Sequence, residues 1–234
     1  MKIAVGLVAV LAAAGAFGGE VVAQWTFGKD GLRDVSGNGH DLVSFGAKLE
    51  DEGARLDGKA AYLRTAKVLD LSDCRALTVE CWFKPEGIVD PFAVIFGNDL
   101  PDEPGTSGGF VTYLSTWAKG GENSVRGQFR TLPGSWQIER QLGAAALVGG
   151  WHHLAYVIDP GAAGDAIAVL YLDGQAVPDT HYSQGCVAKA FLNQKFFIGG
   201  GALYARLRGN HFQGVIGGAR ITAKALRPEE FFHK

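Results

Sequence analysis

The chain has 234 residues and a formal net charge of -2, with 22 basic and 24 acidic side chains spread along it. This balance excludes the basic patch that nucleic acid or an anionic membrane surface would require, and it suits a neutral or mildly polar ligand better. The 34 glycines, twice the usual share of about 7%, favour turns and strands over helices. One domain is expected, because all-β sandwiches commonly exceed about 200 residues without splitting.

Residues 1–18 are predicted to be a secretory signal peptide. Lys2 precedes an apolar run that begins at Ile3 and ends near Ala14, and small residues then allow cleavage after Ala16 or Gly18. The apolar run is too short for a membrane span, so none is expected. The mature domain, residues 19–234, is therefore expected to be exported: secreted, periplasmic or on the cell surface.

Three cysteines, Cys74, Cys81 and Cys186, leave an odd number in a chain expected to be exported. Their spacing does not determine a pairing. A disulfide from Cys186 to Cys81 or to Cys74, and buried free thiols, are both open.

Beyond residue 21, short apolar runs are separated by Gly, Asp, Asn and Pro about every 8–12 residues, which is typical of a β-sandwich or barrel. Strands are expected at residues 22–27, 54–56, 62–64, 77–84, 93–96, 110–116, 125–131, 136–141, 151–159, 166–172, 195–198 and 212–221. A turn and a short helix are expected at residues 225–232, since Pro228 suits the first position of a helix. This segment would close the chain against the sandwich.

Three of these segments predict more than a strand. The strand at 125–131 alternates apolar residues with Arg126, Gln128 and Arg130, so one face is expected in the core and the other to be polar. The strand at 151–159 is apolar on both faces and should be central in its sheet. Asp173-Gly174 predicts a tight hairpin in which Gly takes a positive φ and Asp binds its own backbone.

Eight short strings, in this order, resemble a laminin-G-like domain of the concanavalin A-like class: WTF at 25, DVSGNGHDL at 34, LDG at 56, LTVECWFKP at 77, WHHLAYVID at 151, LYLDG at 170, FFIGG at 196 and FQGVIGGARI at 212. The resemblance spans residues 21–226. It implies an all-β fold, a two-sheet antiparallel β-sandwich (jelly roll). It does not specify a ligand.

The loop at residues 34–41 resembles a turn that often lies beside a calcium site in this superfamily. Asp34, Asn38 and Asp41 would supply some of the six to eight oxygens that Ca²⁺ requires. The alternative is a self-bonded turn, in which these side chains bind local amides and the glycines take left-handed angles.

Sugar recognition combines an aromatic face for stacking with planar hydrogen-bonding side chains. Residues of these kinds lie in or near three successive expected strands: Tyr113, Trp117, Arg126, Gln128, Arg130, Trp136, Gln137 and Arg140. The alternative is scattered packing aromatics and solvated charges on an outer face. Trp151 is expected to pack at the core or its rim instead of binding sugar.

Catalytic patterns are weak. The chain lacks the Glu-Xaa-Asp-Xaa-Xaa-Glu string of laminarinase-type hydrolases, and Glu50-Asp51-Glu52 resembles a solvated turn. The string Gln137-Ile138-Glu139 matches the Gln-Ile-His strand of alginate lyases only in part. We therefore expect a non-catalytic domain that binds carbohydrate. A structural or adhesive module binding an extracellular or envelope protein is the alternative, and a divergent polysaccharide-active enzyme is the third.

Overall fold

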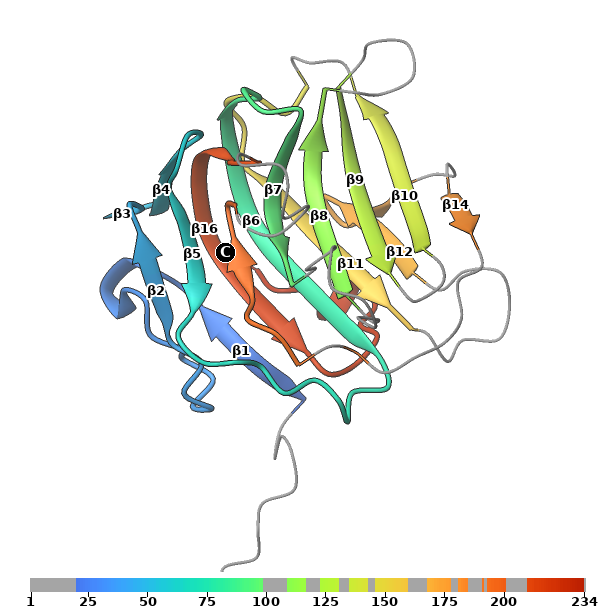
Figure 1. Ribbon diagram of the computed structural model, residues 1–234, viewed down its shortest axis with the longest axis horizontal. Helices are drawn as coiled ribbons and strands as arrows, with labels where there is room; N and C mark the ends of the chain where they lie inside the picture. The colour runs from blue at the N-terminus through green and yellow to red at the C-terminus, as the bar shows by residue number, and fades with distance from the viewer. Residues whose placement is uncertain are drawn as a thin grey trace, which may run out of the picture.

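A computed structural model describes residues 20–98, 109–116, 123–130, 135–142, 146–159, 168–177, 181–184, 191, 193–200 and 210–233, with the backbone alone at 123, 130, 135–142 and 181–184. These residues form two antiparallel sheets stacked as a sandwich (Figure 1). The expected signal peptide lies outside the described residues.

Sheet I contains β1 (Val21–Trp25), β3 (Lys48–Glu50), β4 (Gly53–Asp57), β6 (Leu77–Gly87), β11 (His152–Ile158), β12 (Ala168–Leu172), β13 (Gln175–Ala176) and β16 (Gln213–Thr222). Its strand order is β13-β12-β11-β6-β16-β4-β3, and β1 also pairs with β16. Sheet II contains β2 (Leu42–Phe45), β5 (Tyr62–Thr65), β7 (Phe92–Gly97), β8 (Gly109–Ser115), β9 (Asn123–Arg130), β10 (Ser135–Leu142), β14 (His181–Gln184) and β15 (Phe197–Ile198). Its order is β14-β10-β9-β8-β7-β15-β5-β2. Single turns of 3-10 helix occur at Gly28–Asp30 (η1) and Pro228–Glu230 (η2).

The two-sheet antiparallel sandwich predicted from the sequence is confirmed, and every expected strand corresponds to a strand of the structure. The strands β2, β3, β13 and β14 were not expected. The residues of β3 are all exposed, β2 buries only Leu42, and β13 has two residues. Strands of this kind have no alternation of apolar and polar residues from which to predict them.

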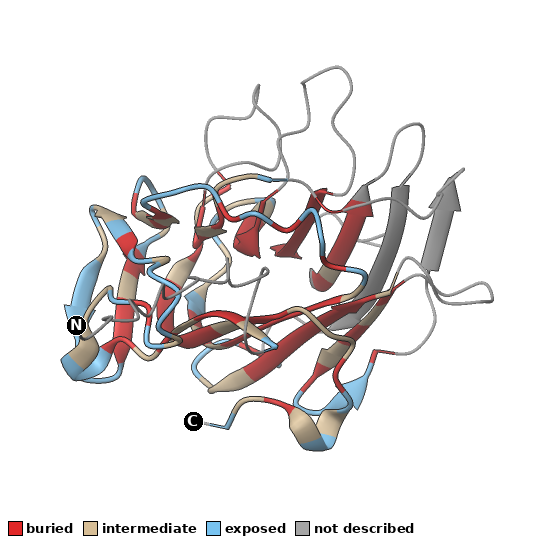
Figure 2. Cartoon of the chain, turned by 90° about the horizontal axis from the view of Figure 1, so that it is seen from below, coloured by how far each residue is buried: buried red, intermediate tan, exposed pale blue. Residues whose placement is uncertain are grey.

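The core lies between the two sheets, where the buried residues gather in Figure 2. The indole of Trp25 stacks on the ring of Phe196 with 5.6 Å between ring centroids. Its Nε1 donates a hydrogen bond to the carbonyl oxygen of His40, at 3.0 Å. A buried indole gives its full area to the core only if its N–H finds an acceptor, and this bond supplies one.

As predicted, β11 is central and lies between β6 and β12. Its outward residues Ala155 and Val157 are covered by Leu226 and Phe231. These belong to the C-terminal segment, residues 223–233, which includes η2. The expected closing turn and short helix are therefore confirmed.

The hairpin between β12 and β13 is also confirmed, with positive φ angles at Asp173 (53°) and Gly174 (76°). The expected bond from Asp173 to its own backbone is wrong. Its Oδ1 accepts the backbone N–H of His153 at 2.8 Å, and its Oδ2 lies 2.8 Å from Nδ1 of His152. The carboxylate thus ties the turn to β11.

Cys74 and Cys81 are buried free thiols, which is the second of the two alternatives for them. Cys186 lies outside the described residues. Among the described residues, no helix is long and apolar enough to cross a membrane.

Candidate binding face on sheet II

The loop at residues 34–41 is organised around the carboxylate of Asp34. Its Oδ1 accepts the backbone amides of Gln24 (3.0 Å) and Ser36 (2.9 Å), and its Oδ2 accepts that of His40 (2.9 Å). Burial alone raises the pKa of this carboxyl. The bonds from Gln24, His40 and Ser36 outweigh burial, so the pKa lies below its ordinary value.

The other two predicted calcium ligands make similar local bonds. Asp41 Oδ1 accepts the backbone amide of Asp34 at 2.9 Å, and Asn38 Nδ2 donates to the carbonyls of Val21 and Val22. Within the described residues, no three His, Cys, Asp or Glu side chains gather where they could hold a metal. These contacts fit the self-bonded turn and do not fit a calcium cage, and calcium binding stays a prediction.

Of the predicted sugar-binding residues, Tyr113, Arg126 and Gln128 have described side chains. The register of β8 and β9 places Tyr113 opposite Arg126 and Val111 opposite Gln128. All of these positions lie on the outer face of sheet II, which is turned away from sheet I. Their alternates Leu114, Val125 and Phe129 are buried in the core. The predicted division of this strand into a core face and a polar face is confirmed for the described side chains.

The outer-face residues are less exposed than a polar face suggests, because Tyr113 and Gln128 retain 3% and 2% of their accessible surface. Tyr113 packs with Phe92, Val94 and Val111. Trp117 lies outside the described residues, as do the side chains of Arg130, Trp136, Gln137 and Arg140. In the backbone register, 137 lies opposite 128, whereas 136 and 140 lie opposite 129 and 125. The backbone positions of the predicted set are thus in register with residues of both faces of β9.

A second group of aromatic side chains lies on the same outer face, over β2, β5 and β15. We call Phe45, Tyr62, Phe197 and His211 the aromatic cluster. Phe45 and Tyr62 stack with 4.6 Å between centroids and 4° between planes, and Phe197 and His211 each lie 6.3 Å from Tyr62. All four rings are partly exposed.

Arg64 lies beside this cluster, two residues beyond Tyr62 on β5 and in register with Phe197. Its guanidinium carbon is 4.9 Å from the centroid of Phe45, a cation–π contact. Within the described residues, no carboxylate forms an ion pair with Arg64. Its Nε and the Nδ1 of His211 are shielded from water and lack a hydrogen-bond partner.

Two observations explain why these rings are held in place. Leu63 and Ile198 alternate with the outer-face residues and are fully buried, so the core fixes β5 and β15. Gly200 packs so closely that a Cβ there would lie 2.6 Å from Nδ1 of His211. Sequence reasoning missed the cluster because β2 was not expected. The spacing of Tyr62 and Arg64 around buried Leu63 was the available signal.

The outer face of sheet I carries a different arrangement, centred on the fully buried Glu80. Its Oε2 accepts Arg220 Nε at 2.8 Å, and its Oε1 accepts the backbone amide of Phe232 at 2.7 Å. Nε2 of His153 lies 3.3 Å from Oε1. Trp82 Nε1 donates to the carbonyl of Phe232. These contacts hold the C-terminal segment against the sheet.

A pocket of about 230 Å³ remains beside this segment, lined by Trp82, His153, Asp173, Gly174, Pro228, Phe231, Phe232 and His233.

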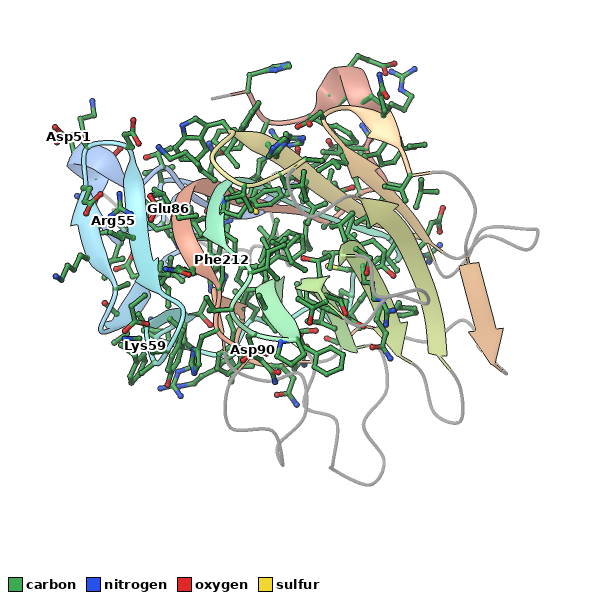
Figure 3. All side chains as sticks on the ribbon, turned by 90° about the horizontal axis from the view of Figure 1, so that it is seen from above. Asp51, Arg55, Lys59, Glu86, Asp90 and Phe212 are labelled. Carbon is green, nitrogen blue, oxygen red and sulfur yellow. The ribbon has the colours of Figure 1, made fainter. Side chains whose placement is uncertain are left out.

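Another polar group lies on β3, β4 and β6 of sheet I. Arg55 pairs with Glu50 at 2.7 Å and with Glu86 at 2.6 Å. In Figure 3, Arg55 and Glu86 lie on the sheet I side, and Lys59 and Asp90 lie toward sheet II. The Glu50-Asp51-Glu52 run forms the exposed turn between β3 and β4, as expected.

The two-sheet antiparallel sandwich is consistent with a concanavalin A-like domain. The sequence profile described as the concanavalin A-like lectin/glucanases superfamily matches residues 57–231. The chain belongs to this superfamily. It has no significant sequence match among curated proteins.

Solved structures with the same fold share little sequence with the chain. The binding domain of botulinum neurotoxin serotype D has a TM-score of 0.61 and 12% identity over 90% of this chain. A Trypanosoma rangeli sialidase in complex with sialic acid has a TM-score of 0.59 and 13% identity, also over 90% of this chain. A SAP-like pentraxin from Limulus polyphemus has a TM-score of 0.50 and 16% identity. This match covers 75% of this chain and 77% of the pentraxin chain. The chain spans 50% of the neurotoxin domain and 32% of the sialidase, and these likenesses concern the fold alone.

Proposed function

We propose that this domain binds carbohydrate without cleaving it, on the outer face of sheet II. The observation that carries the proposal is the partly exposed stack of Phe45 on Tyr62, with Phe197 and His211 beside it. Sugar rings present apolar C–H faces edged by hydroxyls, and such faces pack on aromatic rings while planar polar groups bind the hydroxyls. Arg64 supplies planar donors next to the rings.

Membership of a lectin and glucanase superfamily supports a carbohydrate ligand. So do two similar structures: botulinum neurotoxin type C, whose cell entry depends upon interaction with two ganglioside molecules, and the sialidase with its sialic acid. The fold by itself does not choose between binding and hydrolysis.

The contacts of two described carboxylates, Asp90 and Glu80, support binding over hydrolysis at their positions. Glycosidases place two carboxyl groups about 5–9.5 Å apart across the bond to be cleaved. Asp90, at the start of β7, instead accepts the backbone amides of Phe92 and Asn210, at 2.9 and 2.6 Å. Glu80 is buried on the other sheet beneath the C-terminal segment. Both carboxylates therefore hold backbone in place.

The test is a glycan array followed by titration calorimetry of the best ligand. Tyr62→Ala removes the central ring and should reduce affinity at least about fivefold, since stacking of a nucleic acid base on an aromatic ring contributes about 1–3 kcal/mol and we expect a sugar face to contribute a similar amount. Trp151→Ala is the matched control, because this partly exposed indole directly precedes β11 of sheet I, where Lys84 lies over its ring.

Each outcome has a separate meaning. Loss of binding in the Tyr62 variant alone supports the proposed face. A blank array for the wild type would favour the structural or adhesive module instead. Release of reducing sugar from the bound glycan would contradict the non-catalytic assignment. We also propose export through residues 1–18, which N-terminal sequencing of the mature protein tests.

A further inference from the structure

The cation beside the aromatic cluster points to the kind of sugar that this face binds, an inference that rests on the proposed function. Arg64 has no ion-pair partner in the described part of the chain, and Lys195, two residues before Phe197, has none either. Two other arginines of the described residues are paired with carboxylates: Arg55 with Glu50 and Glu86, and Arg220 with Glu80.

Two nitrogen atoms near the cluster lack a hydrogen-bond partner. Arg64 Nε and His211 Nδ1 are both shielded from water without a hydrogen bond. The side chain of Arg64 is partly exposed, so a ligand can reach the exposed part of its guanidinium. An anionic group on that ligand would give the guanidinium the acceptor that the described residues do not supply.

Three carboxylates of the described residues bind backbone amides instead of Arg64. Asp90 is occupied by two backbone amides, and Asp41 accepts the backbone amide of Asp34. Asp57, at the end of β4, accepts the amides of Lys59, Ala60 and Ala61. The outer face over β2, β5 and β15 is consequently basic as well as aromatic.

We propose that the aromatic cluster and Arg64 bind a sugar that carries an anionic group, a carboxylate or a sulfate ester. The rings of Tyr62 and Phe45 would support the sugar, and the guanidinium would bind two oxygens of its acidic group. Arginine suits this pairing because its planar fork matches the two oxygens of a carboxylate and also binds phosphate-like groups.

The test compares ligands that differ only in charge. Oligogalacturonate and its methyl ester have the same ring and linkage, and the ester lacks the negative charge. We expect oligogalacturonate, or in the second arm a carrageenan oligosaccharide whose only anionic groups are sulfate esters, to bind at least tenfold more tightly than its uncharged methyl ester or desulfated counterpart. Affinity should fall as sodium chloride is raised.

Variants separate Arg64 from general charge effects. Arg64→Gln should remove the preference for the charged ligand, and Arg64→Lys should keep part of it. Arg75→Gln is the matched control, because Arg75 is exposed in the segment before β6 and its loss changes the net charge equally. Unfolding midpoints equal to that of the wild type establish that the variants fold.

The outcomes distinguish this inference from the proposed function. If the methyl ester binds as tightly as the acid, and Tyr62→Ala still abolishes both, the face binds neutral glycan and the anionic assignment is wrong. The same conclusion follows if Arg64→Gln changes nothing. If no glycan of either kind binds, the proposed function itself fails. Preference for one acid over the other identifies the anionic group.

Discussion

At the scale of single residues, the Asp34 carboxylate holds the loop at residues 34–41 against β1, because it accepts backbone amides from both. Three backbone amides point at its two oxygens. Asp34→Asn would place an NH₂ group against at least one of these donors. Because Asp34 is buried, we expect a loss of about 1–3 kcal/mol in the free energy of unfolding.

Urea denaturation of the wild type and of Asp34→Asn measures this loss. Repeating it with calcium and with chelator also tests the calcium prediction. If the loop is a self-bonded turn, the variant is destabilised by the same amount in both conditions. A calcium-dependent rise in wild-type stability that the variant lacks would establish the metal site instead. Ser72→Ala serves as the control, because Ser72 lies in an exposed turn that follows β5 in the chain.

Asp57 gives the chain a predictable dependence on acid. The amides of Ala60, Ala61 and Lys59 lower the pKa of its carboxyl from 3.8 to about 2. A carboxyl whose pKa is lower in the folded state stabilises that state fully above the unfolded value, and this contribution is lost as pH falls through the folded value. Stability from Asp57 should therefore decline below about pH 4 and be absent below about pH 2.

Asp57→Asn should reduce this acid-dependent decline, since the amide does not titrate. The measurement is the urea midpoint at pH 7 and at pH 3 for both proteins. The difference between the two pH values should be smaller in the variant. An equal difference would mean that other carboxyls, including Asp34, account for the decline.

At the scale of elements, the C-terminal segment depends on Glu80. This fully buried carboxylate pairs with Arg220, and Arg220 also donates to the carbonyl of Glu230. Glu80→Gln would leave a guanidinium of 17% exposure without its countercharge. We expect a loss of about 3 kcal/mol, because removing one partner of a buried pair strands the other.

The control is the partly exposed pair of Lys224 and Glu230 in the same segment, at 3.1 Å. Lys224→Gln should change stability by less than about 1 kcal/mol, as exposed pairs contribute little. Limited proteolysis, read by mass spectrometry, should show earlier cleavage in residues 223–233 for Glu80→Gln. Unchanged cleavage together with a large loss of stability would place the role of Glu80 in the sheet and not in docking the segment.

The same elements show what sequence patterns can predict here. Strong alternation or continuous apolar runs predicted β6, β11 and β16, because their buried side chains repeat with the period of a strand. Glu80 lies within such a run, and nothing local indicated that Arg220 would reach it from 140 positions away in the chain. The aromatic cluster combines side chains of β2, β5 and β15 with His211. Only the sheet order brings them together, so the sequence predicted a polar face near β9 and missed these rings.

At the scale of the whole molecule, Cys74 and Cys81 are buried to different depths in the sandwich, so their reactivity can distinguish local opening from global unfolding. Cys81 is fully buried at the middle of β6, between β11 and β16. Cys74 lies in the segment before β6 and keeps 7% of its surface. Burial raises the pKa of Cys74 to about 11 and that of Cys81 well above its ordinary value, so few thiolates exist near pH 8. Only the thiolate reacts with alkylating reagents.

We therefore expect both thiols to resist iodoacetamide in the native protein at pH 8 and to react once urea unfolds it. Cys74 should react at lower urea than Cys81, because opening one surface segment needs less free energy than separating the sheets. Mass spectrometry of digested protein follows each cysteine separately, and Cys186→Ser removes the third thiol from the reaction. Simultaneous labelling of Cys74 and Cys81 at the urea midpoint would mean that the segment before β6 opens only when the whole sandwich unfolds.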